Sequence, residues 1–155
     1  MVIIDLDNCI SNDEWRRSAI LTDEKDMVVK YHRYQMLAAF DEAHNLDLIK
    51  PGVEVAILTS RPIFYKPITE EWLRRLEISP TIILMRDHGD LSSEPDLKRK
   101  QLIHLQKLCK ESKRQGRGKK TINKAYDDRP DVVKMYRKKG IRAEVRAINA
   151  RSENA

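Results

Sequence analysis

Four aspartates end two apolar runs of the sequence that lie far apart along the chain. Asp5 and Asp7 end the first run, and Asp127 and Asp128 end a run near the carboxyl terminus. Carboxylates gathered at one place repel one another unless a positive group lies among them. Oxygen-rich sites of this kind suit a hard cation, for which we expect Mg²⁺. If folding brings the two runs together, the sequence predicts a magnesium site.

A third apolar run ends in polar residues that suit phosphate. Thr59, Ser60 and Arg61 follow the run Val53–Leu58. A lone polar residue at such a position is often only a turn or helix cap. Three such endings, in order and on alternating elements, make coincidence improbable.

Predicted strands and helices alternate along the chain. Strands are predicted over Val2–Leu6, Val53–Leu58, Thr81–Met85, Thr121–Tyr126 and Ile141–Ile148. Helices are predicted from Glu24 to Ala43, from Pro67 onward, from a Ser93 and Asp96 capping box to about Lys113, and over Pro130–Lys139 before Gly140. This alternation predicts an α/β fold with a mostly parallel sheet covered on both faces. Functional groups of such sheets lie beyond the carboxyl ends of the strands.

The composition is that of one soluble domain. The chain has 155 residues, of which 41% are hydrophobic and 35% charged, and its apolar runs are too short to span a bilayer. We expect a single domain over residues 1–150 and a tail over 151–155. The early acid at Asp5 argues against a signal peptide, and Cys9 and Cys109 do not make a disulfide framework. A cytoplasmic location is therefore expected.

The positive charge is concentrated in one segment. The net charge is +6, and residues 98–124 hold eleven basic residues and one acidic residue. A concentrated basic surface attracts polyanions, so this segment is a candidate contact for nucleic acid. The alternative is a solvated helix surface followed by a flexible loop. The segment has no aromatic residue on which bases could stack.

Four short motifs resemble those of the haloacid dehalogenase superfamily. They are Val2 to Cys9, Ala56 to Thr59, Lys98 at the start of a helix, and Ala125 to Asp128. They follow one another in the family's order over nearly the whole chain. The resemblance implies a Rossmann-like three-layer sandwich, with a five-stranded sheet of order 5-4-1-2-3 and a minimal helical cap inserted over residues 10–49.

Within that superfamily, two stretches resemble the phosphatase domain of bacteriophage polynucleotide kinase-phosphatase and its stand-alone relatives. They are Thr59 to Arg61 and Asp127 to Gly140. One departure is Asn8-Cys9, where the family has Gly-Thr. Asparagine tolerates a positive φ, so Asn8 can replace glycine in a tight turn. Cys9 is an improbable nucleophile, because its aspartate neighbours disfavour a thiolate.

The resemblance implies a role for each acidic residue. Asp5 attacks phosphorus and becomes an aspartyl-phosphate, while Asp7 protonates the leaving alcohol and then activates water. Mg²⁺ is held by the Asp5 carboxylate, the Asp7 backbone carbonyl and Asp127, and by Asp128 directly or through water. Thr59 donates a hydrogen bond to a phosphate oxygen, with Ser60 as the alternative.

Two basic residues complete the implied site. At about 100° per residue, Lys98 lies about 40° from Leu102 within the apolar stripe of its helix, whereas Lys100 lies about 160° away. Lys98 therefore faces the sheet, where its ammonium can neutralise Asp5 and the phosphate. Arg61 is positioned to hold a substrate phosphate through two hydrogen bonds.

The insert over residues 10–49 is too small for a full lid domain. An open site admits bulky substrates such as nucleic-acid ends. Trp15, Arg16, Arg17 and His32 are candidates for lining the entrance, although packing or solvated surface is the commoner role for each.

We therefore expect a Mg²⁺-dependent phosphomonoesterase that acts on a nucleotide or a polynucleotide 3′-phosphate. One alternative is a phosphatase of free nucleoside monophosphates. Another is a non-catalytic nucleic-acid-binding domain that uses the basic segment. The sequence leaves the oligomeric state open.

Overall fold

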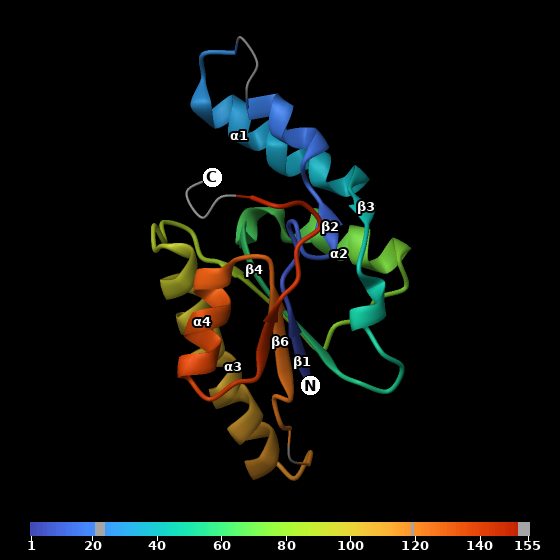
Figure 1. Ribbon diagram of the computed structural model, residues 1–155, viewed down its shortest axis with the longest axis vertical. Helices are drawn as coiled ribbons and strands as arrows, with labels where there is room; N and C mark the ends of the chain where they lie inside the picture. The colour runs from blue at the N-terminus through green and yellow to red at the C-terminus, as the bar shows by residue number, and fades with distance from the viewer. Residues whose placement is uncertain (21–23, 119, 152–155) are drawn as a thin grey trace.

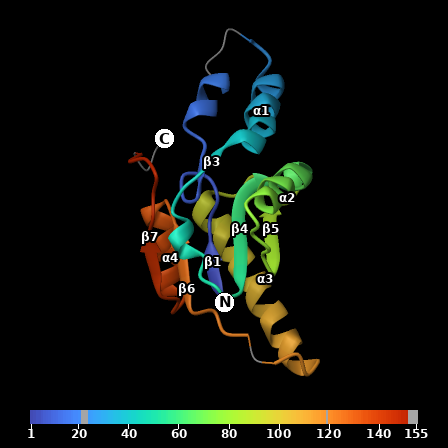
Figure 2. The ribbon, with the colours of Figure 1, turned by 90° about the vertical axis from the view of Figure 1, so that its right-hand side faces the viewer.

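A five-stranded parallel sheet forms the centre of the molecule. The computed structural model describes residues 1–20, 24–118 and 120–151. The strands of the sheet are β1 (Val2–Ile4), β4 (Val55–Pro62), β5 (Ile82–Arg86), β6 (Lys124–Asp127) and β7 (Ala143–Val145). Their order is β5-β4-β1-β6-β7, and every neighbouring pair is parallel. All five carboxyl ends therefore lie at one edge (Figure 1, Figure 2).

The strand numbers in the observed order are not those of the predicted order 5-4-1-2-3, because the structure has two additional strands. Two short strands that the sequence did not predict, β2 (Ser11–Asn12) and β3 (Glu42–Ala43), form a separate antiparallel pair and take two numbers. Counted along the chain without them, the five strands of the main sheet lie in the order 3-2-1-4-5, which is the predicted 5-4-1-2-3 read from the opposite edge. This order places the first strand centrally, with the second and fourth on either side.

Helices cover both faces of the sheet. Alternate residues of a strand point to opposite faces, so Ile3 packs in one core and Val2 and Ile4 in the other. The helices are α1 (Met27–Met36), α2 (Lys66–Arg75), α3 (Glu94–Arg114) and α4 (Pro130–Lys138). α3 and α4 cover the Ile3 face, and α2 contributes Trp72 and Leu73 to the other (Figure 1).

Two predicted helix ends are confirmed by their capping contacts. The Ser93 hydroxyl accepts a hydrogen bond from the Asp96 amide at 3.4 Å, at the start of α3. Gly140 has a φ of 79° just after α4, a conformation in which a side chain would be strained. These ends determine where α3 begins beside the sheet and where the chain turns back into β7.

The single helix predicted from Glu24 to Ala43 is wrong. α1 ends at Met36, a 3₁₀ turn follows over Leu37–Phe40, and β3 then pairs with β2. The apolar spacing continues past Met36, but Asp41 has extended backbone angles and its carboxylate lies in a buried ion-pair network. α1 and the 3₁₀ helix η1 (Trp15–Ile20) pack together above the carboxyl ends of the strands (Figure 1). Residues 21–23 of the predicted insert lie outside the described residues.

β4 is longer than predicted, and β7 is shorter. β4 includes Thr59, Ser60 and Arg61, which were expected to follow it, and its pairing with β5 is irregular between Leu58 and Pro62. Of the predicted tail, only Arg151 is described. In the described part of the chain, no helix is long and apolar enough to cross a membrane.

Candidate functional site

Three carboxylates meet at the tips of β1 and β6. Asp5, Asp127 and Asp128 each offer an oxygen atom, and these atoms lie within 4.8 Å of one another. The Lys98 ammonium lies beside them, 2.6 Å from Asp5 Oδ1 and 3.1 Å from Asp127 Oδ2. It also donates a hydrogen bond to the Leu58 carbonyl. The predicted convergence of the two acidic strand ends opposite Lys98 is present.

The pKa values show which charges this cluster tolerates. Burial, followed by repulsion from Asp127, raises the pKa of Asp5 well above its usual range, although Lys98 acts in the opposite direction. Burial and Asp127 also raise the pKa of Asp128 to about 6. The carboxylates raise the pKa of Lys98 against the effect of its burial, so Lys98 stays protonated. One ammonium therefore does not fully compensate the three acids.

The cluster fits a divalent cation. Asp127 Oδ2 is buried and accepts no hydrogen bond, although Lys98 is near, so its lone pairs remain available to a ligand. The donors are carboxylate oxygens, the ligands that Mg²⁺ prefers. The side chain of Asp7, which was also assigned to the metal through its backbone carbonyl, lies outside this cluster.

Asp7 is held by two buried arginines. Arg61 Nη2 lies 2.7 Å and Arg16 Nη2 lies 2.6 Å from Asp7 Oδ1. Burial of Asp7 is outweighed by Arg61 and Arg16, which lower the pKa of Asp7 to about 2. Arg61 was predicted to hold a substrate phosphate, but its guanidinium already donates to Asp7, Ser11 and Thr69. Asp7 is therefore ionised in this arrangement.

Arg16 was a candidate for lining the entrance, but the structure places it in the buried support of Asp7. It is fully buried and binds Asp41 through Nε at 2.9 Å, in addition to Asp7. The Arg16 guanidinium also lies over the Tyr34 ring, with 4.2 Å between the guanidinium carbon and the ring centroid. Arg16 joins β1, α1 and the turn before β3. No sequence spacing links Arg16 to Asp41, so this contact had no local signal.

Replacing Arg16 with alanine is expected to lower the free energy of unfolding by about 3 kcal/mol or more, because Asp41 and Asp7 lose a buried partner. Arg17→Ala is the matched control: Arg17 is partly exposed and lies 3.6 Å from Asp13. Its loss should cost less than about 1 kcal/mol. Urea unfolding of both variants measures this difference. Equal stabilities would contradict the buried-pair interpretation.

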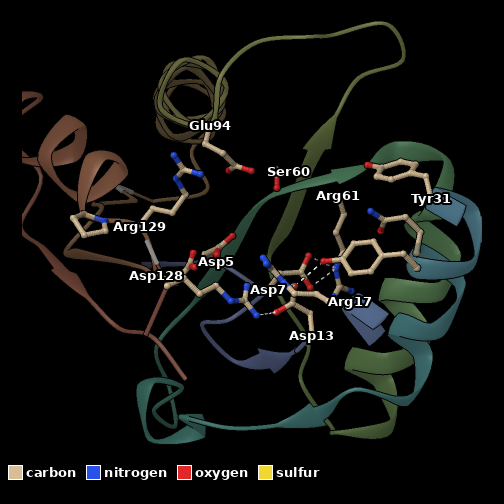
Figure 3. Close-up of a pocket in the computed structure, with 14 residues that line it drawn as sticks. Asp5, Asp7, Asp13, Arg17, Tyr31, Ser60, Arg61, Glu94, Asp128 and Arg129 are labelled. Atoms are coloured by element: carbon tan, nitrogen blue, oxygen red, sulfur yellow. Dashed lines mark hydrogen bonds and ion pairs between the residues drawn. The ribbon is translucent and has the colours of Figure 1, made fainter. Parts of the chain in front are cut away.

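A pocket of about 240 Å³ opens beside the carboxylates. Its walls include Asp5, Asp7, Ser60, Arg61 and Asp128 (Figure 3). Ser60, the alternative to Thr59, lines this pocket, whereas Thr59 does not. The Thr59 hydroxyl oxygen is buried and accepts the Arg61 amide at 3.2 Å.

Of the four candidate entrance residues, Arg17 alone lines this pocket. Trp15 donates its indole N–H to Asp41, and Arg16 is buried. His32 Nδ1 lies 3.1 Å from the Tyr65 hydroxyl. These three residues therefore do not line the space.

Asn8 connects the site to the end of the chain. Its φ of 61° confirms the predicted positive φ and places Asn8 in a left-handed turn, a conformation that favours glycine. Its side-chain amide donates to Asp128 at 3.1 Å and to the Asn149 carbonyl at 3.0 Å, and its side-chain oxygen accepts the Asn149 amide. Further along, Arg151 pairs with Asp13. Asn8 thus orients Asp128 and anchors the C-terminal segment, which a glycine could not do.

Replacing Asn8 with glycine is expected to destabilise the protein by about 1–3 kcal/mol. Glycine accepts the positive φ, so the loss reports the side-chain contacts alone. Thermal unfolding of Asn8→Gly measures this loss of stability. Asn123→Gly is the control for replacing asparagine with glycine in a loop. A melting temperature unchanged from wild type would contradict this role.

Cys9 does not have the surroundings of a reactive thiol. It is completely buried, and burial followed by the negative charge of Asp5 raises its pKa well above the usual value. A thiolate is therefore disfavoured, in agreement with the expectation from sequence.

The basic segment 98–124 is divided between different surroundings. Lys98 is buried at the site, and Lys100, Lys120 and Lys124 form ion pairs with acids. Among the described residues, the basic side chains of this segment without an ion pair are Lys107, Lys110, Lys113, Arg114 and Arg117. Lys119 lies outside the described residues. The unpaired charges lie toward the far end of α3, away from the carboxylates (Figure 1).

Solved structures share this fold. A chain of the Pnkp1/Rnl/Hen1 RNA repair complex superposes with a TM-score of 0.65 at 24% identity, covering 94% of this chain and 41% of that chain. A chain in a second structure of the Pnkp1/Rnl/Hen1 complex gives a TM-score of 0.64 at 23% identity, covering 94% and 45%. This chain thus spans less than half the length of each of these two chains. No protein-family model and no curated protein sequence matches it.

Proposed function

We propose that the protein is a Mg²⁺-dependent phosphatase of the haloacid dehalogenase type that hydrolyses a nucleotide or polynucleotide 3′-phosphate. The observation that carries this proposal is the cluster of Asp5, Asp127 and Asp128 opposite the Lys98 ammonium. The shared fold with chains of RNA repair complexes supports nucleic-acid ends as the substrate class. A pure binding domain has no physical need for so costly a buried cluster.

Asp5 is the proposed nucleophile. Its carboxylate lines the pocket and attacks phosphorus, the bond from phosphorus to the leaving oxygen breaks, and an aspartyl-phosphate forms. Water then attacks phosphorus and releases inorganic phosphate, which restores Asp5. Asp5, Asp127 and Asp128 would hold Mg²⁺, which would supply positive charge to offset the repulsion between the phosphate and the carboxylates. Lys98 provides a fixed positive charge on the opposite side.

Asp7 is the proposed acid and base, and this role requires a change on substrate binding. An ionised carboxylate cannot donate a proton to the leaving alcohol, and Arg61 and Arg16 keep Asp7 ionised. An incoming phosphate dianion competes for the Arg61 guanidinium, which lines the same pocket. As the pair between Arg61 and Asp7 weakens, the pKa of Asp7 rises toward the range of a general acid. Ser60, which lines the pocket, is the proposed hydroxyl donor to the phosphate, in place of the buried Thr59.

Magnesium is expected to stabilise the protein more at about pH 7.5 than at about pH 5. The folded Asp128 has a pKa of about 6, against about 4 for an unfolded carboxyl. Folding therefore takes up a proton between these values, and the stability contribution of this group falls as the pH rises through that window. Bound Mg²⁺ offsets the repulsion between the ionised carboxylates, so it should stabilise the protein more at the pH where they are ionised. Melting temperatures with and without MgCl₂ at both pH values test it, and an equal shift at both would contradict it.

A substrate panel tests the proposed activity. Phosphate release is measured from a 3′-phosphorylated oligonucleotide, a 5′-phosphorylated oligonucleotide and a nucleoside 3′-monophosphate, each with Mg²⁺. The proposal predicts release from the 3′-phosphorylated oligonucleotide. Preference for the free nucleotide would favour a nucleotidase. Nucleic-acid binding without release from any compound would favour a binding domain and contradict the proposal.

A further inference from the structure

Aromatic side chains form an exposed row that begins at the pocket. Tyr31 of α1 lines the pocket and its side chain is 45% exposed. Figure 3 shows it at the pocket edge, with its hydroxyl directed toward the Ser60 side. Phe64, in the 3₁₀ turn Ile63–Tyr65 after β4, is 75% exposed. Large apolar rings held in water beside a pocket are typical of a binding surface.

Ring contacts place Phe64 beside the helix that carries Tyr31. His32, the residue after Tyr31 in α1, has its ring centroid 5.7 Å from that of Tyr65. Phe64 packs edge-on against Tyr65, with 5.0 Å between ring centroids, and lies 6.5 Å from the His32 ring. His32 Nδ1 in turn lies 3.1 Å from the Tyr65 hydroxyl. Tyr65 is buried and supports Phe64 from below, so the exposed ring has a fixed position.

The charge beside this row is positive. The Arg86 guanidinium donates to the carbonyl oxygens of Ser60, Asp90 and Ser92, and within the described residues it forms no ion pair. Ser60 lines the pocket together with Tyr31, so Arg86 lies on the pocket side of the row. Rings next to an uncompensated cation suit a ligand that combines flat bases with phosphodiesters.

We propose that Tyr31 and Phe64 form a stacking platform for the nucleobases of a single-stranded polynucleotide adjacent to its phosphorylated end. The inference rests on the proposed function, because it names a polynucleotide rather than a free nucleotide as the substrate of the same site. The phosphate enters the pocket beside Asp5, and the preceding bases leave it over Tyr31 toward Phe64. A free mononucleotide reaches at most the Tyr31 end of this row.

Steady-state kinetics of Phe64→Ala test the platform. Loss of one stacking ring should raise KM for a 3′-phosphorylated single-stranded oligonucleotide about tenfold with little change in kcat. Both constants for p-nitrophenyl phosphate, which has no base, should stay at wild-type values. Phe64→Trp should keep the low KM, because an indole also stacks. Phe40→Ala is the matched control, since Phe40 is 71% exposed but lies in the 3₁₀ turn Leu37–Phe40, outside the ring contacts of His32, Phe64 and Tyr65.

Binding measurements separate this inference from the proposed activity. Fluorescence anisotropy with an unphosphorylated single-stranded oligonucleotide in EDTA requires no turnover. The platform predicts that Phe64→Ala and Tyr31→Leu weaken binding about tenfold and that Phe40→Ala does not. If the wild type binds in this way but releases no phosphate, the proposed activity fails and the platform stands. If Phe64→Ala and Tyr31→Leu bind and turn over the oligonucleotide as the wild type does, the platform is overturned.

Discussion

Replacing Asp5 with asparagine is expected to lower kcat for phosphate release at least about a thousandfold, while the fold remains intact. The amide is isosteric with the carboxylate but cannot form the aspartyl-phosphate. Because burial and Asp127 raise the pKa of Asp5, its ionised form destabilises the folded state at neutral pH. Asp5→Asn should therefore be at least as stable as wild type in EDTA.

Phosphate release and thermal unfolding of the same preparation give both results. Asp47→Asn is the control, because Asp47 lies on the surface, paired with Arg146 and 64% exposed. It should keep full activity. Wild-type turnover by Asp5→Asn would refute covalent catalysis at this residue. A melting temperature of Asp5→Asn below that of wild type in EDTA would contradict the stability prediction.

Removing the charge of Lys98 should have the largest effect on stability. Lys98→Met keeps most of the side-chain volume but leaves Asp5 and Asp127 buried without their ammonium partner. The free energy of unfolding in EDTA should fall by about 3–5 kcal/mol. Turnover with Mg²⁺ should fall at least about a hundredfold, since the transferring phosphoryl group loses a fixed positive charge.

A double variant separates the lost ion pair from lost packing. Adding Asp5→Asn to Lys98→Met removes one uncompensated carboxylate, so the double variant should be more stable than Lys98→Met alone. Lys100→Ala is the control on the same helix, because its side chain is half exposed and pairs with Asp90 at the surface. It should cost less than about 1 kcal/mol. Equal losses in Lys98→Met and Lys100→Ala would contradict the role of the buried ammonium.

The acidic part of the site was predictable because it depends on parallel strands. Asp5 and Asp127 end neighbouring strands, and parallel strands bring their carboxyl ends to one edge. Lys98 was predictable from its helical phase, since one face of α3 must pack on the sheet. Both arguments use only local periodicity and a general rule of topology.

The arginine network was not predictable by such arguments. Arg16 and Asp41 are 25 positions apart and meet because η1, α1 and the pair of β2 and β3 fold together. The apolar spacing of 24–43 predicts one helix, but the buried ion pairs of Asp41 favour extended backbone at that residue. Contacts of this kind depend on tertiary packing, which local pattern does not encode. For the same reason, the bond from Asn8 to Asp128 had no signal beyond the tolerance of Asn for positive φ.

The most direct test of the central claim is phosphate release from a 3′-phosphorylated oligonucleotide by the wild-type protein, with Mg²⁺ and then with EDTA. We predict release with Mg²⁺, loss of release in EDTA, and recovery when excess Mg²⁺ is restored. Release that persists in EDTA, or no release with any divalent cation, would contradict a metal-dependent phosphatase built on Asp5, Asp127 and Asp128.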